Sequence, residues 1–301
     1  VFREVSRLGE RLKKLDDIVG TLTEAKAAIL YDWVNDWALK DARAFHPWDK
    51  KLMKTVKSFY SPLWEKGIDT DVIGVEDDFE KYRLIIAPMM YSISEGLAEK
   101  LEGFVKQGGI LLATYMTGMV DENDLCYLGG LPCGRLKDVF GIWNEEIDSL
   151  FPEEKNRVLL KDGTAVTAVD YCEVIHVDKA EVLATYDSDY YKGMPAATVN
   201  KYGDGKAYYI AFRDTGEYTD MTVNALLREA GICSGFDGEL PQGVTAHTRT
   251  DGEKTFVFLQ NFSYSPKSVK TEKEWRVFET GEKLTGEFEM EPLQTIIIYK
   301  P

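Results

Sequence analysis

The chain has 301 residues and a formal net charge of −15, with 44% hydrophobic and 29% charged residues. Its length and composition predict a globular protein of two domains. The negative charge argues against a nucleic-acid or anionic membrane partner, because both require a basic surface. No apolar run approaches the length of a membrane span, so we expect no membrane partner.

The four cysteines are widely and irregularly spaced, and none forms a zinc-type pair with another cysteine or a histidine. We therefore expect reduced thiols in a cytoplasmic protein, with no metal and no other cofactor. The first residues are charged throughout and lack an initiator methionine, so we expect a piece of a longer chain.

The amino-terminal half alternates helical and strand patterns. Residues 1–20 predict an amphipathic helix that packs on whatever precedes it, with Val5, Leu8 and Leu12 on one face. Residues 27–31 and 71–73 predict buried strands. Between them, residues 52–64 predict a helix that Pro62 should kink or split.

Residues 84–113 have the pattern of a strand–helix–strand unit. The apolar runs 84–87 and 110–113 predict strands that are parallel and joined by a right-handed crossover. Ser92 and Glu95 have capping-box spacing, which predicts the start of the helix. Ligands of such sheets bind beyond the carboxyl ends of the strands, here residues 88–91 and 114–123.

Shorter patterns follow. We expect several short strands between residues 158 and 186, a hairpin around Tyr202–Lys206, and a helix over 219–230. Residues 233–243 resemble a linker. After it, alternating runs predict a small antiparallel β-sandwich or half-barrel.

The triplet His176-Val177-Asp178 resembles the His-x-acid pair of class I glutamine amidotransferases, whose fold contains the same strand–helix–strand order. Their nucleophilic cysteine follows the strand that corresponds to residues 110–113. This chain has Thr114-Tyr115-Met116 there, and a tyrosine is largely protonated at neutral pH. The resemblance therefore implies the fold without the activity, and His176 is expected to be structural.

Several longer strings resemble glycoside hydrolase family 42 β-galactosidases, in the order of that family: ILYDWVNDWAL from Ile29, FYSPLWEKGIDTDVI from Phe59, LIIAPMMYSISEGLAEKLEGFVKQGG from Leu84, and FETGEKLTGEFEMEPLQTIIIYKP from Phe278. The resemblance implies that a catalytic N-terminal TIM barrel is missing from this chain, so no catalytic residue is transferred. It also implies a flavodoxin-like trimerisation domain that closes a neighbouring subunit's active site.

We therefore expect an α/β fold, flavodoxin-like or amidotransferase-like, with an open parallel sheet and flanking helices. The expected divisions are a connecting helix at 1–20, an α/β trimerisation domain at 21–235 and a small all-β domain at 242–301. The predicted partners are further copies in a homotrimer, the parent's TIM barrel and a β-galactoside at the active-site rim.

The predicted function is the non-catalytic oligomerisation and rim portion of a retaining β-galactosidase. A stand-alone amidotransferase-like enzyme and a carbohydrate-binding module are the alternatives. Trp33, Trp37 and Trp48 form an aromatic cluster in the sequence. Tryptophan is frequent at protein interfaces and in sugar-binding sites, although these three residues could equally cover the end of the sheet. The candidate interface or rim residues are Trp33, Trp37, Trp48, Tyr115, Asp121, Glu122 and Asn123.

Overall fold

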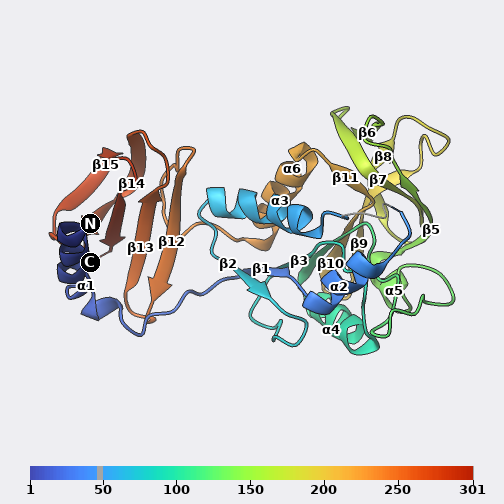
Figure 1. Cartoon of the computed structure of the whole chain (residues 1–301), viewed down its shortest axis with the longest axis horizontal. Coiled ribbons are helices and arrows are strands. Elements are labelled where there is room, and N and C mark those ends of the chain that lie inside the picture. Colours follow the sequence, from blue (N-terminus) through green and yellow to red (C-terminus); the bar gives the residue numbers. More distant parts are fainter. Residues whose placement is uncertain (46–49, 301) are drawn as a thin grey trace. The chain divides into compact units, whose positions relative to one another are not determined.

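A computed structural model describes residues 1–45 and 50–300 of the chain (Figure 1). The chain forms two compact units. The α/β unit consists of Lys26–Tyr60 and Asp71–Gly231, and the β unit consists of Val1–Ala25, Ser61–Thr70 and Ile232–Pro301. No helix in the described ranges is both long and apolar enough to cross a bilayer.

The α/β unit contains most of the helices and one large sheet. Its helices are α2 (Trp33–Asp41), α3 (Leu52–Glu65, which continues into the β unit), α4 (Glu95–Lys106), α5 (Leu136–Phe140) and α6 (Glu217–Ala230). Its strands are β1 (Ala27–Leu30), β2 (Thr70–Ile73), β3 (Leu84–Ala87), β4 (Ile110–Thr114), β5 (Ile142–Ser149), β6 (Asn156–Leu160), β7 (Ala165–Val177), β8 (Glu181–Tyr186), β9 (Pro195–Tyr202), β10 (Gly205–Ile210) and β11 (Phe212–Asp214).

The sheet is mixed, whereas an open parallel sheet was expected. Its strand order is β11-β7-β6-β8-β9-β10-β4-β3-β1-β2, with β5 paired to β7. Strands β1, β3, β4 and β10 pair in parallel, and β5 to β9 with β11 pair antiparallel. The difference arises because short hairpin connections, such as the turn Tyr202–Gly205 between β9 and β10, allow only antiparallel neighbours.

Helices cover both faces of the parallel half, as Figure 1 shows. Adjacent residues of β10 face opposite sides, because side chains alternate along a strand. The Tyr208 hydroxyl donates to Glu229 of α6, and the Tyr209 ring packs on Phe140 of α5 with centroids 5.3 Å apart. Burial on both faces explains why β1, β3 and β4 are continuously apolar.

The predicted strand–helix–strand unit is present, with β3 and β4 parallel. The predicted capping residue is wrong. Ser94, in extended backbone at φ −70° and ψ 159°, accepts a hydrogen bond from the Leu97 amide at 3.2 Å. Ser92 instead donates to the Asp121 carbonyl at 3.0 Å, so it fastens the loop after β4. Two serines within reach of one helix start made the spacing ambiguous.

Helix α3 continues through Pro62, where a kink or a break was expected. Proline removes one amide donor and crowds the preceding turn. Here the helix ends within one turn, at Glu65, and the Gly67 amide donates to the Trp64 carbonyl at 3.0 Å. The proline therefore lies too close to the helix end to divide it into two segments.

The β unit has one five-stranded antiparallel sheet with the order β12-β13-β16-β14-β15, where a β-sandwich or half-barrel was expected. The remaining elements of the unit are α1 (Phe2–Leu12), the short 3-10 helix η1 (Asp16–Ile18), β12 (Val244–Thr250), β13 (Thr255–Asn261), β14 (Lys267–Val277), β15 (Lys283–Met290) and β16 (Thr295–Tyr299).

Both faces of this sheet are apolar, and different segments cover them. Phe236 packs with Trp275 and other core side chains on one face. On the other face, Ile18 packs on Phe256 and Ile297. The second layer is therefore the amino-terminal segment rather than a second sheet. Sequence patterns could not reveal this cover, because it comes from the opposite end of the chain.

The corrected helix cap can be tested by substitution. Ser94→Ala should lower the free energy of unfolding of the α/β unit by about 1 kcal/mol, because a helix amide loses its acceptor. Ser94→Asp should retain most of the stability, since aspartate also caps a helix start. Urea unfolding followed by circular dichroism measures both, and equal loss in the two variants would contradict the cap.

Candidate functional site

The carboxyl ends of β3 and β4 carry strained backbone. Met89 follows β3 with φ 48°, and Met116 follows β4 with φ 62°. Lys51 and Asp170, whose side chains meet beside this edge, have φ 60° and 61°. Positive φ is uncommon for residues with a side chain, and such strain persists where surrounding contacts hold it. This edge of the sheet is therefore a candidate functional site.

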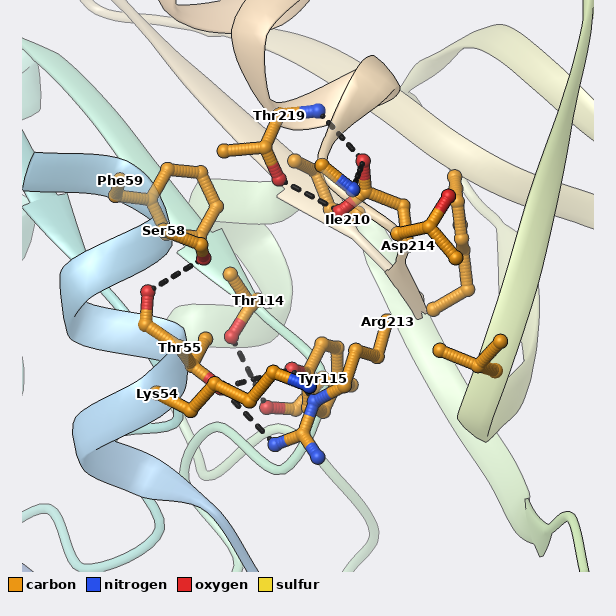
Figure 2. A pocket seen from close by; sticks show the side chains of 14 residues that line it. Lys54, Thr55, Ser58, Phe59, Thr114, Tyr115, Ile210, Arg213, Asp214 and Thr219 are labelled. Atoms are coloured by element: carbon orange, nitrogen blue, oxygen red, sulfur yellow. Dashed lines mark hydrogen bonds between the residues drawn. The ribbon is translucent and has the colours of Figure 1, made fainter. Parts of the chain in front are cut away.

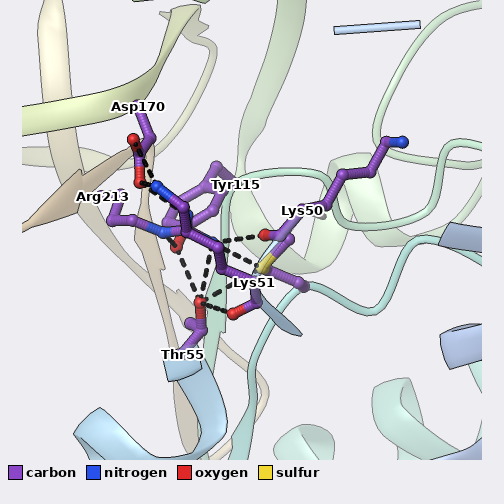
Figure 3. Close-up of polar contacts among 7 residues, drawn as sticks. Lys50, Lys51, Thr55, Tyr115, Asp170 and Arg213 are labelled. Atoms are coloured by element: carbon purple, nitrogen blue, oxygen red, sulfur yellow. Dashed lines mark hydrogen bonds and ion pairs between the residues drawn. The ribbon is translucent and has the colours of Figure 1, made fainter. Parts of the chain in front are cut away.

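A buried arginine connects the elements at this edge, as Figure 3 shows. Arg213 of β11 is 6% exposed. Its Nε donates to the Tyr115 hydroxyl at 2.7 Å, and its Nη1 donates to Asp170 Oδ2 at 2.8 Å. Its Nη2 donates to the Lys50 carbonyl at 2.7 Å and to Thr55 Oγ1 at 2.9 Å. One guanidinium therefore links β4, β7, β11 and the start of α3.

Asp170 balances the positive charge of this network. The Lys51 ammonium donates to both of its carboxylate oxygens at 2.9 Å, beside the bond from Arg213. Burial alone would raise the pKa of Asp170, but the hydrogen bonds from Lys51 and Arg213 outweigh burial and lower the pKa below its usual value. The carboxylate stays ionised at neutral pH, which satisfies the buried arginine.

A fully buried carboxyl group, that of Glu173, also lies on β7, and no cation among the described residues pairs with it. Glu173 is fully buried and accepts a hydrogen bond from the Met116 amide at 2.7 Å and from the Tyr209 hydroxyl at 2.7 Å. Burial raises its pKa to about 7, although these hydrogen bonds oppose the shift. Glu173 thus stabilises the strained backbone of Met116 through a hydrogen bond to its amide.

The turn after β4 has the geometry of a nucleophile turn but no nucleophile. Met116 occupies the strained position, and its thioether is fully buried. His176 lies on β7, stacks on Trp143 with centroids 4.0 Å apart, and pairs with Glu145 at 2.6 Å. These contacts are on the surface, whereas Tyr115 contacts Thr55 and Arg213 in the interior. The Cys-His-acid arrangement of amidotransferases is therefore not assembled.

A cavity of about 190 Å³ opens beside the network, between α3 and the start of α6 (Figure 2). Its polar walls are occupied by internal hydrogen bonds. Ser58 donates to the Thr55 carbonyl at 2.7 Å, and Asp214 accepts from the Thr219 hydroxyl at 2.7 Å and from the Gly216 amide at 2.9 Å. Neither described histidine lines this cavity, and the Asp214 carboxylate that does line it also accepts from the Thr219 amide at 2.9 Å.

The candidate residues predicted from the sequence divide into a surface group and a buried one. The side chains of Trp33 and Trp37 on α2 are each 62% exposed, and Glu122 and Asn123 are also exposed. Tyr115 is only 2% exposed, so its side chain does not lie on the surface as expected of an interface or rim residue. Its ring turns inward because its hydroxyl satisfies Arg213. Trp48 lies outside the described residues.

A second cavity, of about 330 Å³, brings part of this surface group together. It is lined by α2 and by the loop after β4, and Trp37, Glu122 and Asn123 contribute to it. Asp121 of the same loop is half-buried, and its Oδ1 accepts a hydrogen bond from the Asn123 amide at 2.8 Å. The tryptophan and the loop, separated by more than eighty residues in sequence, thus form one site.

Sequence reasoning missed Arg213, Asp170 and Glu173. A charged residue inside an otherwise apolar strand was the available signal, because Arg213 follows the run from Ala207 to Phe212 and Glu173 precedes Val174 and Ile175. No group of three or more histidine, cysteine or acidic side chains suited to a metal ion occurs among the described residues.

The arginine network should be sensitive to loss of its cation. Arg213→Met should lower the free energy of unfolding by about 3–5 kcal/mol, because it leaves Asp170 and the Tyr115 hydroxyl buried with fewer partners. Combining it with Asp170→Leu should recover part of the loss, because the partly buried carboxylate that lost its arginine partner is then removed. Urea unfolding of both variants measures the difference. A double variant less stable than Arg213→Met would contradict this coupling.

Glu173 should make stability depend on pH. Its pKa in the folded chain, about 7, exceeds its ordinary value of 4.5, so the folded state binds more protons between these values. Stability should therefore fall as pH rises from 4.5 to 7, by roughly 3 kcal/mol from this group, at about 1.4 kcal/mol per pKa unit. Glu173→Gln should abolish that part of the slope in chemical unfolding.

The exposed Glu153 provides the control, because Glu153→Gln removes a carboxyl group of the same kind from the surface. Its unfolding free energy should follow that of the original chain across this pH range. Parallel pH profiles for Glu173→Gln and the original chain would show that Glu173 does not titrate in the interior as described.

The chain resembles known β-galactosidases over nearly its whole length. The family model for the β-galactosidase trimerisation domain matches residues 25–233, and that for the β-galactosidase C-terminal domain matches residues 243–300. The β-galactosidase Pbg of Clostridium perfringens is 43% identical over 99% of this chain. The β-galactosidase GanA of Bacillus subtilis is 36% identical, also over 99%. The chain spans only 44% of each of these two relatives.

Solved structures agree with this assignment. The β-galactosidase of Rahnella sp. R3 superimposes with a TM-score of 0.92 at 40% identity, covering 99% of this chain and 44% of that one. The enzyme from Bacillus circulans sp. alkalophilus has a TM-score of 0.93 at 35% identity, with coverages of 100% and 45%. The chain therefore belongs to the glycoside hydrolase family 42 β-galactosidases, as their trimerisation and C-terminal domains.

Proposed function

We propose that this chain is the non-catalytic oligomerisation and active-site-rim portion of a retaining β-galactosidase. The match of residues 25–233 to the trimerisation domain is the observation that carries the proposal. The parent enzyme would hydrolyse terminal β-galactosides through two carboxylates on an N-terminal TIM barrel, outside this sequence. The partners of the chain would then be that barrel, two further copies of the same protein, and a β-galactoside at the rim.

The strand order supports a flavodoxin-like description of the parallel half. Read from the edge, the order β2-β1-β3-β4-β10 follows the 2-1-3-4-5 arrangement of flavodoxin-like sheets, with parallel pairing of β1, β3, β4 and β10. In this family of topologies the carboxyl ends of the strands are the usual location of a site. Here the buried Met116 and the hydrogen-bonded Arg213 network occupy that edge.

We assign the rim or interface role to the exposed face of α2 and the loop after β4. Trp33 and Trp37 place two large apolar side chains in solvent, and exposed aromatic groups are enriched at protein interfaces. Asp121, Glu122 and Asn123 form the adjoining loop. Tyr115 supports this surface from within, through Arg213, rather than by contact with a partner. A cytoplasmic location fits four cysteines that form no disulfide in the structure.

A carbohydrate-binding module is the remaining alternative, and one observation favours it. Trp37 lines a cavity with the Asn123 amide and the Glu122 carboxylate, a combination that also occurs in sugar sites. Calorimetry with galactose and lactose separates the two roles. Saturable heat that disappears in Trp37→Ala would favour the sugar module over the scaffold.

The isolated chain should not hydrolyse an aryl β-galactoside. We expect release of the aryl group no faster than with a heat-denatured sample of the same chain, because the catalytic carboxylates would lie elsewhere. Spectrophotometric assay at micromolar protein concentrations measures this rate. Turnover well above the denatured control would overturn the assignment of the chemistry to a missing barrel.

The chain should also self-associate into a trimer. Light scattering and sedimentation velocity across the micromolar range should detect a species with three times the mass of the chain. Symmetric association of exposed apolar surface provides the driving force. A monomer at high micromolar concentration would contradict self-association of this portion.

A further inference from the structure

The cavity between α2 and the loop after β4 combines aromatic and acidic walls; we refer to it as the Trp37 cavity. Val34, Trp37 and Ala38 form its apolar wall. Its polar wall carries the carboxylates of Asp41, Glu122 and Asp124, together with Ser92 and Asn123. A space of about 330 Å³ accommodates the end of a long side chain. The cavity is therefore more than an apolar patch, because its chemistry selects an occupant.

The Trp37 cavity carries negative charge from three carboxylates. Across residues 1–45 and 50–300, no lysine or arginine forms an ion pair with Asp41, Glu122 or Asp124. The carboxylates come from two segments far apart in the sequence, so their proximity is a product of the fold. Grouped like charges repel one another, and a cation bound among them relieves that repulsion.

The walls of the Trp37 cavity are fixed before any partner binds. Asn35 of α2 donates to the Met89 carbonyl at 3.0 Å and accepts from the Ser92 amide at 3.0 Å. In the loop, Asp121 Oδ1 accepts from the Asn123 and Leu125 amides at 2.8 and 3.0 Å. A preformed site binds more tightly, because less ordering entropy is lost on binding.

We propose that the Trp37 cavity receives a cationic side chain, best an arginine, from a second copy of the protein. A guanidinium stacks on an indole ring and donates two parallel hydrogen bonds to a carboxylate, so it uses both walls at once. This inference rests on the proposed function, since the second copy is the partner in the trimer. It adds the chemistry of recognition and a dependence of assembly on salt.

Neutral variants of the three carboxylates test the role of charge. The triple variant Asp41→Asn, Glu122→Gln, Asp124→Asn keeps the shape of the cavity and removes its charge. We expect its association constant, from sedimentation velocity, to fall by about tenfold or more, and its salt dependence to weaken. The matched control neutralises the exposed Glu76, Glu80 and Glu153 elsewhere on the α/β unit, which form no ion pair with the described residues.

Association of the control should match that of the original chain. Equal weakening in both triple variants would overturn the inference, because net charge alone would then set assembly. A trimer that forms normally in the cavity variant would also overturn it, while the proposed function would stand. A chain that stays monomeric at every concentration contradicts the proposed self-association instead, and a direct binding measurement then decides about the cavity.

That measurement uses agmatine, which carries a guanidinium group, and methyl β-galactoside as small probes. The indole N–H resonance of Trp37, assigned by its loss in Trp37→Phe, should shift on titration with agmatine and saturate. The shift should be lost in the triple cavity variant and retained in the control. A resonance that responds to the galactoside and not to agmatine would identify a sugar platform and reject the cationic occupant.

Discussion

The α/β unit depends on one buried guanidinium. Arg213 of β11 satisfies the Tyr115 hydroxyl, the Lys50 carbonyl, Thr55 and Asp170, and so joins β11 to the end of β4, to β7 and to the start of α3. Removing a charge from water is costly unless its hydrogen bonds are complete, so the four elements must meet in one arrangement. The ion pair between Lys51 and Asp170, two residues at positive φ, adjoins these bonds. Hydrogen bonds and ion pairs, and not apolar packing alone, therefore fix the arrangement of the elements at this edge of the sheet.

Local patterns predicted much of the parallel half. The continuous apolar runs of β1, β3 and β4 required burial on both faces, and α4 has the periodicity of a helix on a sheet. The antiparallel half was predicted as separate short strands without an order, because pairing partners are set by tertiary contacts. The thirteen-residue strand β7 pairs with β5, β6 and β11, and its alternation is broken by Glu173. No local sequence pattern predicts that one strand pairs with three others.

The candidate site was predicted in part. Trp37, Glu122 and Asn123 were chosen as surface residues from composition and resemblance, and they share one cavity. Tyr115 was assigned to the same surface, because residues after a strand of an α/β sheet commonly face a ligand. Its burial follows from Arg213, which lies 98 residues further along the chain. Sequence proximity to Asp121 could not reveal that the chain turns its tyrosine inward and its acidic loop outward.

The β unit is assembled from three separated stretches of the chain. Ile18 of the first stretch covers Phe256 and Ile297, and the Arg11 guanidinium donates to the Thr295 carbonyl at 2.8 Å. The β unit is consequently a discontinuous domain, whose three stretches alternate along the sequence with the two stretches of the α/β unit. Residues 242–301 expressed alone would leave one apolar face of the sheet in water. A fragment designed to fold as the isolated sheet must therefore include the amino-terminal segment, joined by circular permutation or supplied by co-expression.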